Sequence, residues 1–149
     1  MNTAPIGGTA RWTGRVLSGL AVLFLLFSSV LKLAAPPEVI ATFVTLGIPA
    51  QLATGLGLLE LSCTLVYAIP RTALLGAILL TGYLGGAIAT HLRMLDPWLS
   101  HTLFPLYVGA LVWGGLLLRD RRVRELALAV WQGIRGCRSD AAPGVIGTP

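Results

Sequence analysis

The feature that most constrains this chain is how little charge it carries along most of its length. Of its 149 residues, 11% are charged and 55% are hydrophobic, and the mean hydropathy is +0.80. A soluble domain usually has about 25% charged residues, so this chain has too few to cover a surface that faces water. The composition predicts a membrane protein and argues against a soluble enzyme, a disordered region or a disulfide scaffold.

Apolar stretches with almost no charge predict four transmembrane helices. They fall at about residues 16–34, 51–69, 72–92 and 102–118, and Glu60 is the one charged residue that interrupts the second stretch. A membrane-spanning helix needs about 17 to 25 predominantly apolar residues, which each stretch provides. The first stretch is also longer than the core of a secretory signal peptide, which favours a retained span. The sequence therefore predicts an all-α fold, a polytopic membrane four-helix bundle.

Basic residues set the predicted orientation of this bundle. Lys32 and Arg93 fall at one end of the predicted spans, and a larger group of arginines falls at the other end. The larger group consists of Arg11, Arg15, Arg71, Arg119, Arg121, Arg122 and Arg124. Because cytoplasmic loops carry an excess of Lys and Arg, we expect both termini, including residues 1–15, on the cytoplasmic side of a multi-pass protein in the cell inner membrane.

A short interfacial helix is predicted between spans one and two. Pro36 and Pro37 end the first span, and residues 38–46 then present an apolar face. Such a face suits a helix that lies in the plane of the membrane surface. Gly47 is placed to stop this helix.

The C-terminal part of the chain has a different character. Residues 119–136 alternate arginines with apolar residues at helical spacing, which predicts a basic amphipathic cytoplasmic helix. We expect this helix to lie on the anionic cytoplasmic leaflet, and projection into water is the alternative. Residues 137–149 are rich in Gly and Pro and are predicted to be disordered.

Small residues are expected to let the spans pack closely, because lipid provides no hydrophobic gain when helices associate. Gly82 and Gly86 form a small-xxx-small pair in the third span. The other spans offer Gly55, Gly57, Gly109, Gly114 and Gly115. We interpret these glycines as packing surfaces rather than as a phosphate-binding loop.

Glu60 is the residue that most needs an explanation. A charged side chain near the centre of a spanning helix costs about 2.5 to 3.5 kcal/mol, so Glu60 is expected to face the bundle interior and to have a partner. Tyr83 in the third span lies at a similar estimated depth and is a candidate for a hydrogen bond to Glu60. Nearer the outer end come Lys32, His91 and Arg93.

Together these residues predict a polar pocket that opens outward. The candidate ligand-binding residues are Lys32, Glu60, Tyr83, His91 and Arg93, with Glu60 as the floor. An ionisable residue inside a membrane is by default a candidate site. The alternative is structural, with Glu60 tied to neighbouring helices so that it fixes their register.

Other chemistries find little support in the sequence. Cys63 and Cys137 are far apart and form no CxxC motif, so neither a disulfide nor a dithiol redox site is expected. A metal site at His91, His101 and Asp96 lacks any HxxxH or HExxH pattern. Nucleic-acid binding is not expected, because the basic residues sit at the ends of apolar stretches. No complete catalytic set is present, so we expect no catalytic activity of the chain on its own.

Three segments together resemble the DoxX-like family of small bacterial membrane proteins. They read SSVLKLAAPPEVIATFVTLGIP, LELSCTLVYAIPRTALLGAILLTGYLGGAIATHLR and FPLYVGALVWGGLLLRD, and the resemblance covers about residues 18–126. The resemblance implies a four-helix membrane bundle, in agreement with the spans predicted above. Family positions correspond to Lys32, Glu60, Pro70, Arg71, Gly82, Gly86, His91 and Arg93.

For function, the resemblance implies an association with redox enzymes. The wider family takes its name from a small membrane subunit of a thiosulfate–quinone oxidoreductase, although most members have no assigned activity. The expected role is an accessory or scaffold subunit for a quinone-dependent oxidoreductase. Its partners would be the lipid bilayer and a membrane or peripheral oxidoreductase, and it would need no cofactor of its own, with quinone available through the partner. The alternative is a small-molecule binder or transporter that uses the pocket around Glu60, and a homo-oligomer stays open.

Overall fold

The computed structural model of this chain describes residues 8–94 and 103–140, and for residues 135–140 it describes the backbone alone. Every element in this part of the chain is a helix, so the predicted all-α fold is confirmed. The helices are α1 (Gly8–Ala34), α2 (Pro37–Thr45), α3 (Leu52–Ala68), α4 (Ala73–Arg93), α5 (Phe104–Arg119) and α6 (Arg121–Asp140).

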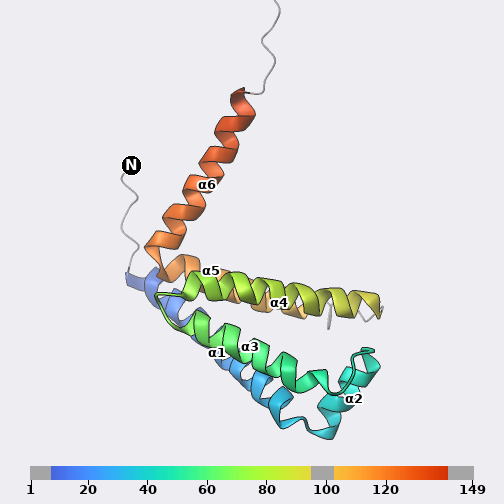
Figure 1. Ribbon diagram of the computed structural model, residues 1–149. Helices are drawn as coiled ribbons and strands as arrows, with labels where there is room; N and C mark the ends of the chain where they lie inside the picture. Colours follow the sequence, from blue (N-terminus) through green and yellow to red (C-terminus); the bar gives the residue numbers. More distant parts are fainter. Residues whose placement is uncertain (1–7, 95–102, 141–149) are drawn as a thin grey trace, which may run out of the picture.

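Helices α1, α3, α4 and α5 pack together, and they coincide with the four apolar stretches of the sequence (Figure 1). Helix α1 packs against α3 and α5, and α4 packs against the same two helices, so the four form a closed ring. By length and composition, α1 and α4 are long and apolar enough to cross a membrane. Helices α3 and α5 are also apolar, but they are shorter, at 17 and 16 residues.

The ring has an apolar exterior, and its interior combines apolar side chains such as Leu25 and Leu80 with small and polar ones. Small and polar residues such as Ser18, Ser29 and Thr64 are fully buried between the helices. Large apolar side chains point outward instead, including Leu23 and Phe27 on α1, Leu58 and Leu65 on α3, Leu75 and Ile78 on α4, and Leu106 and Tyr107 on α5. An apolar exterior, with small and polar residues among the buried side chains, is an arrangement that lipid favours.

At the end of the ring near the N-terminus, Tyr67 holds three helices together. Its hydroxyl donates a hydrogen bond of 2.8 Å to the Val112 carbonyl and lies 2.9 Å from the Ser18 hydroxyl. The Arg119 guanidinium lies over the Tyr67 ring at 5.0 Å and donates a hydrogen bond to the Tyr67 carbonyl. Tyr67 is completely buried, so these bonds satisfy the polar groups of a large side chain inside the ring.

Glycines make the close packing at this end possible, and they are partly different from those predicted. A side-chain carbon on Gly76 would collide with the Tyr67 backbone, one on Gly115 with Ser18, and one on Gly14 with Arg119. Gly115 was among the predicted packing glycines, whereas Gly14 and Gly76 were not.

The prediction that Gly82 and Gly86 form a small-xxx-small packing surface is wrong. A side-chain carbon on Gly82 or Gly86 would meet nothing within 4 Å, and the same holds for Gly55 and Gly114. These glycines therefore do not bring helices together. The spacing of the pair indicates a smooth helix face, but a smooth face packs only if the fold turns it toward another helix.

Several boundaries also differ from those expected. Helix α1 begins at Gly8, so the second half of the predicted N-terminal segment 1–15 is helical. Helix α6 continues to Asp140, so the first residues of the segment predicted to be disordered are helical as well. The remaining residues of that segment, and the predicted loop around Asp96, lie outside the described residues.

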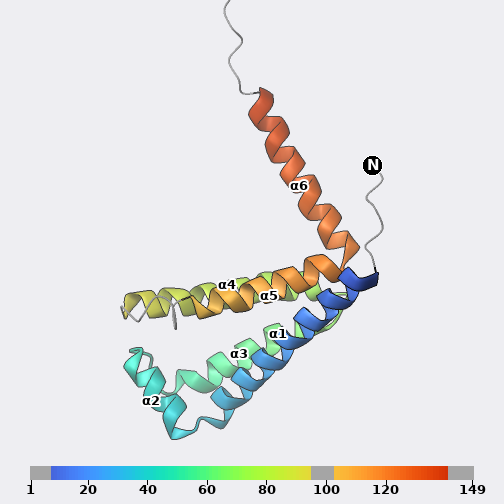
Figure 2. The ribbon, with the colours of Figure 1, turned by 180° about the vertical axis from the view of Figure 1, so that it is seen from behind.

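Helix α6 leaves the ring at a steep angle to α5 (Figures 1 and 2). The change of direction occurs at Asp120, whose backbone is extended between the two helices. The Asp120 carboxylate accepts a hydrogen bond of 2.9 Å from the Arg122 backbone N–H and so caps the start of α6. Beyond Val123, the α6 side chains that the structure describes are exposed.

The two kinds of glycine on α4 predict opposite effects of adding a methyl group. Gly76→Ala is expected to lower the free energy of unfolding by about 1–3 kcal/mol, because the new carbon overlaps the Tyr67 backbone. Gly85→Ala is the matched control, and since it meets open space it is expected to be neutral or to stabilise the helix by up to about 1 kcal/mol. Unfolding of the purified variants in mixed micelles measures both values. Equal effects of the two substitutions would contradict the packing described here.

Candidate functional site

The ring is tight at the Tyr67 end and open at the other. Helices α4 and α5 diverge from α1 and α3 toward the end where α2 lies (Figures 1 and 2). A pocket with a volume of about 720 Å³ occupies the space between them, and residues from all five of these helices line it. Its lining includes four of the five predicted site residues: Lys32, Glu60, Tyr83 and His91.

The polar centre of the pocket is an ion pair between Lys32 and Glu60. The Lys32 ammonium lies 2.9 Å from Oε2 of Glu60. The Ser28 hydroxyl donates a second hydrogen bond, of 3.3 Å, to the same oxygen and accepts one from Lys32. The Glu60 side chain is 3% exposed and that of Lys32 is 20% exposed, so the lysine is the member of the pair that is more open to the pocket.

Gly57 explains why this pair can form. It lies one turn before Glu60 on α3, and a side-chain carbon there would come within 2.9 Å of the Lys32 Cβ and 3.3 Å of the Leu33 backbone. Because glycine leaves this space empty, the last turn of α1 can lie directly against α3. The long lysine side chain then reaches back along α1 to the carboxylate.

Tyr83 and His91 are brought to the same pocket by α4. Tyr83 interacts electrostatically with the Glu60 carboxylate and is partly buried. His91 lines the pocket two turns further along α4, next to Thr90. These positions agree with the order of depth inferred from the sequence. Ligand binding by the residues themselves stays a prediction.

Arg93 takes a different position from the other predicted residues. It is not part of the pocket lining, and its guanidinium donates a hydrogen bond of 3.4 Å to the Leu46 carbonyl just after α2. Gly47 follows with a positive φ of 67°, a conformation that glycine adopts readily. Arg93 therefore links the ends of α4 and α2 beside the pocket.

Most of the pocket wall is apolar, which the prediction of a polar pocket did not include. Phe24 and Leu25 of α1, Phe43 of α2, Leu56 of α3 and Val108 of α5 are among its lining residues. The apolar face predicted for residues 38–46 was the only sequence signal for the part of the wall that α2 contributes. A site of this kind suits a molecule with an apolar body and a small group that forms hydrogen bonds.

The metal site considered from the sequence consists of His91, Asp96 and His101. Of its three residues, Asp96 and His101 lie outside the described residues, and His91 is described. Within residues 8–94 and 103–140, the structure contains no group of three His, Cys, Asp or Glu side chains placed to hold a metal ion. Cys63 is a free, buried thiol in the wall of the pocket.

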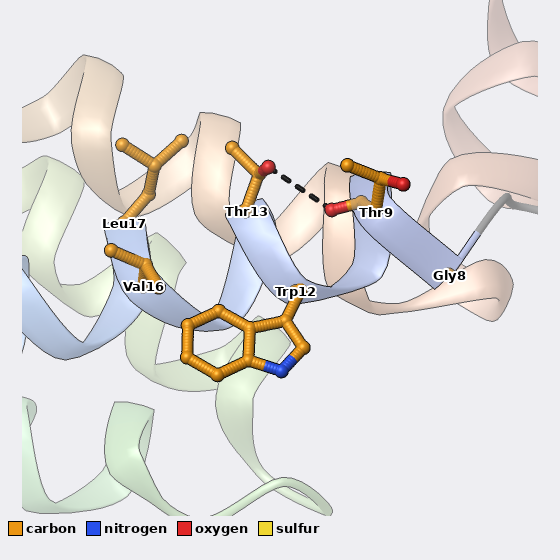
Figure 3. Close-up of a pocket in the computed structure, with 6 residues that line it drawn as sticks. All are labelled: Gly8, Thr9, Trp12, Thr13, Val16 and Leu17. Atoms are coloured by element: carbon orange, nitrogen blue, oxygen red, sulfur yellow. Dashed lines mark hydrogen bonds between the residues drawn. The ribbon is translucent and has the colours of Figure 1, made fainter.

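A second hollow, of about 560 Å³, lies beside the first turns of α1 (Figure 3). The described residues that line it all belong to α1, and the Thr13 hydroxyl already donates a hydrogen bond of 3.0 Å to the Thr9 carbonyl. Trp12 is largely exposed here. Tryptophan is frequent where a membrane meets water, so we interpret this hollow as part of the surface rather than as a binding site.

A family model described as the DoxX-like family matches residues 16–115, which is more than half of the 149-residue chain and includes the Lys32–Glu60 pair. No curated protein and no solved structure matches the chain. The family and the two long apolar helices together indicate a membrane protein.

The ion pair makes a strong prediction about stability. Lys32→Met leaves the Glu60 carboxylate buried without its partner and is expected to lower the free energy of unfolding by about 3–5 kcal/mol. Adding Glu60→Gln to this variant removes the unpaired charge, so the double variant is expected to be more stable than Lys32→Met alone. Unfolding of the original protein, of Lys32→Met, of Glu60→Gln and of the double variant in mixed micelles gives the coupling energy of the pair.

A matched control is the pair Arg121–Glu125 on α6, whose side chains lie 3.6 Å apart and are about half exposed. Glu125→Gln is expected to change stability by less than about 1 kcal/mol, because water screens such pairs. If the effects of Lys32→Met and Glu60→Gln simply add, the two buried side chains are not coupled and this account of the site is wrong.

Proposed function

The chain belongs to the DoxX-like family, and on that premise we propose that it is a four-helix bundle of the cell inner membrane that binds a small molecule in the pocket around Glu60. The observation that carries this proposal is the buried Lys32–Glu60 pair in the wall of an otherwise largely apolar cavity. A structural tie between α1 and α3 needs no cavity beside it, because helices pack to high density when nothing else is required.

The apolar exterior supports four membrane crossings. Helices α3 and α5 are about 25 Å long at 1.5 Å per residue, against a hydrocarbon core of about 30 Å. Both lie in the same ring as the longer α1 and α4, and both expose large apolar side chains outward, such as Leu58 on α3 and Leu106 on α5. Apolar residues flank α3, among them Ile48 and Ile69, and lengthen its apolar stretch.

Charge supports an orientation with both termini in the cytoplasm. Arg15, Arg71 and Arg119 belong to the Tyr67 end of the ring, away from the pocket, and the basic start of α6 follows there. Since Lys and Arg concentrate on the cytoplasmic side, the pocket end faces the outer side of the membrane.

Helix α6 is proposed to lie on the cytoplasmic leaflet. It starts where the apolar α5 ends and turns away from the ring, and Arg122 and Arg124 lie in its first turn. Its apolar residues Leu126, Val130 and Ile134 recur every four residues and are exposed. An exposed apolar face next to arginines fits an anionic lipid surface better than water.

A second proposal, an accessory subunit for a quinone-dependent oxidoreductase, is favoured by the chemistry of the pocket. A quinone has an apolar ring with carbonyl oxygens that accept hydrogen bonds. The Lys32 ammonium and the Tyr83 hydroxyl are donors in the pocket wall, and Phe24 and Leu25 offer an apolar surface. A bound quinone would supply the acceptance of electrons and protons, a partner oxidoreductase would supply the catalysis, and this chain would hold and orient the ring.

Infrared difference spectroscopy of Glu60 tests the binding proposal. When a decyl-substituted benzoquinone is added to the purified protein, we expect a carboxyl or carboxylate band that shifts, because the probe competes for the hydrogen bonds of Lys32 and Ser28. This shifting band is expected to be absent from Glu60→Gln, and in the control Glu125→Gln it is expected to shift as it does in the original protein. An unresponsive Glu60, together with a large loss of stability in Glu60→Gln, would instead support the structural tie.

The position of α6 can be read from Trp131. In a variant with Trp12, Trp98 and Trp113 replaced by Phe, brominated lipids in nanodiscs are expected to quench the Trp131 fluorescence. Quenching is expected to be stronger with phosphatidylglycerol than with phosphatidylcholine alone, because the arginines of α6 attract anionic headgroups. A Trp131 emission spectrum typical of tryptophan in water, with no quenching in either lipid, would mean that α6 projects into solution.

A further inference from the structure

The pocket has an edge that opens sideways rather than toward water. Leu59 on α3 and Ile78 and Leu79 on α4 all line it, yet they are 50%, 53% and 43% exposed. Side chains that border both a cavity and the exterior mark an opening between the two. Since Leu59 belongs to α3 and the other two residues belong to α4, we place this opening between these two helices, which diverge toward α2 (Figure 1).

Small residues keep this opening wide. Ile78, Gly82 and Gly86 follow each other at intervals of four residues, so they form one row along α4. Gly82 and Gly86 line the pocket, and a side-chain carbon on either would meet nothing within 4 Å. The row therefore begins with the exposed Ile78, and the two glycines that follow leave the space beside them open.

The other sides of the pocket are more closed. On the side between α1 and α5, Phe24 and Phe104 also line the pocket and are 38% and 45% exposed, but their rings meet edge to face, with centroids 5.2 Å apart, and so bridge the two helices. At the outer end, α2 lies across the space between α3 and α4, Phe43 is buried there, and Arg93 bonds to the Leu46 carbonyl (Figures 1 and 2).

The depth of the opening decides what reaches it. Ile78 is five residues from the start of α4, or about 7.5 Å along a helix of about 31 Å. In the four-span arrangement proposed above, this depth lies within the hydrocarbon core, where only apolar molecules and the chains of amphiphiles are present.

From these observations we propose that the gap between α3 and α4 is a lateral portal that admits a chain-bearing, membrane-dissolved amphiphile from the bilayer. Its polar head reaches Lys32, Glu60 and Ser28, and its chain lies past Leu59, Ile78 and Gly82 toward the lipid. This inference rests on the proposed binding function and specifies both the ligand class and its route.

Cys63 provides a native reporter for the test, because it lies in the pocket wall one turn from Glu60. With Cys137→Ser it is the only cysteine of the chain. Proteoliposomes of this variant are treated either with N-dodecylmaleimide, which dissolves in the bilayer, or with a sulfonated maleimide, which stays in water. Mass spectrometry of the intact protein gives the rate of labelling.

The portal is closed by Gly82→Leu and the matched control is Gly55→Leu. Both glycines are exposed and meet open space, but Gly55 does not line the pocket. We expect N-dodecylmaleimide to label Cys63 faster than the sulfonated reagent does. Gly82→Leu is expected to slow the dodecyl reagent about tenfold, equivalent to about 1.4 kcal/mol in the barrier, and Gly55→Leu to leave the rate unchanged. Equal thermal midpoints of the two variants exclude misfolding as the cause.

The other outcomes separate the route from the site. An unchanged rate with N-dodecylmaleimide in Gly82→Leu overturns the lateral portal. If the sulfonated reagent labels Cys63 faster than N-dodecylmaleimide does, the lateral portal is also overturned, but the result is consistent with a pocket that is reached from water. If neither reagent labels Cys63 in the folded protein and both do so in denaturing detergent, no route from the bilayer or from water reaches the wall at Cys63, and the lateral portal is overturned.

Discussion

The buried ion pair between Lys32 and Glu60 is the interaction on which the rest of the site depends. The Glu60 side chain is 3% exposed, and a carboxylate buried to this degree is costly unless it is paired; the Lys32 ammonium lies 2.9 Å from it. The pair fixes the last turn of α1 against α3, where Gly57 leaves room for it. Because the two charges cancel, the pocket offers a ligand hydrogen bonds in an apolar surrounding rather than a net charge.

The contrast between the two ends of the ring has a common physical origin. In lipid, burying apolar surface between helices brings no hydrophobic gain. Helices therefore approach closely where a small residue on one helix leaves space that a side chain or backbone segment of the other helix fills. Tyr67 fills the space at Gly76, and Ser18 fills that at Gly115. No side chain fills the space beside Gly82 and Gly86. The helices diverge there, and the two glycines line the pocket that remains.

The sequence alone was sufficient for the helices but not for their contacts. The thickness of the bilayer sets the length of a spanning helix, so the apolar stretches predict where the helices lie. The cost of an unpaired charge inside the membrane predicts that Glu60 is buried in the bundle. Among the residues that interact with the Glu60 carboxylate, this reasoning predicts Tyr83 but not the ion pair with Lys32. Helical depth favours Tyr83, whereas Lys32 is placed near the end of α1. A lysine at such a position normally extends toward the membrane surface, and here it reaches inward to the carboxylate.

The same arrangement limits the kind of molecule that the pocket can hold. A charged ligand would lose its hydration on passing Leu59 or Phe43 and would find Lys32 and Glu60 already neutralising each other. A neutral polar group has no such penalty, because it can share the hydrogen bonds of Ser28 and Lys32 while the ion pair stays intact. For the proposed binding function, the geometry therefore favours neutral amphiphiles over ions, and binding would require the same pairing of the two charges that holds α1 against α3.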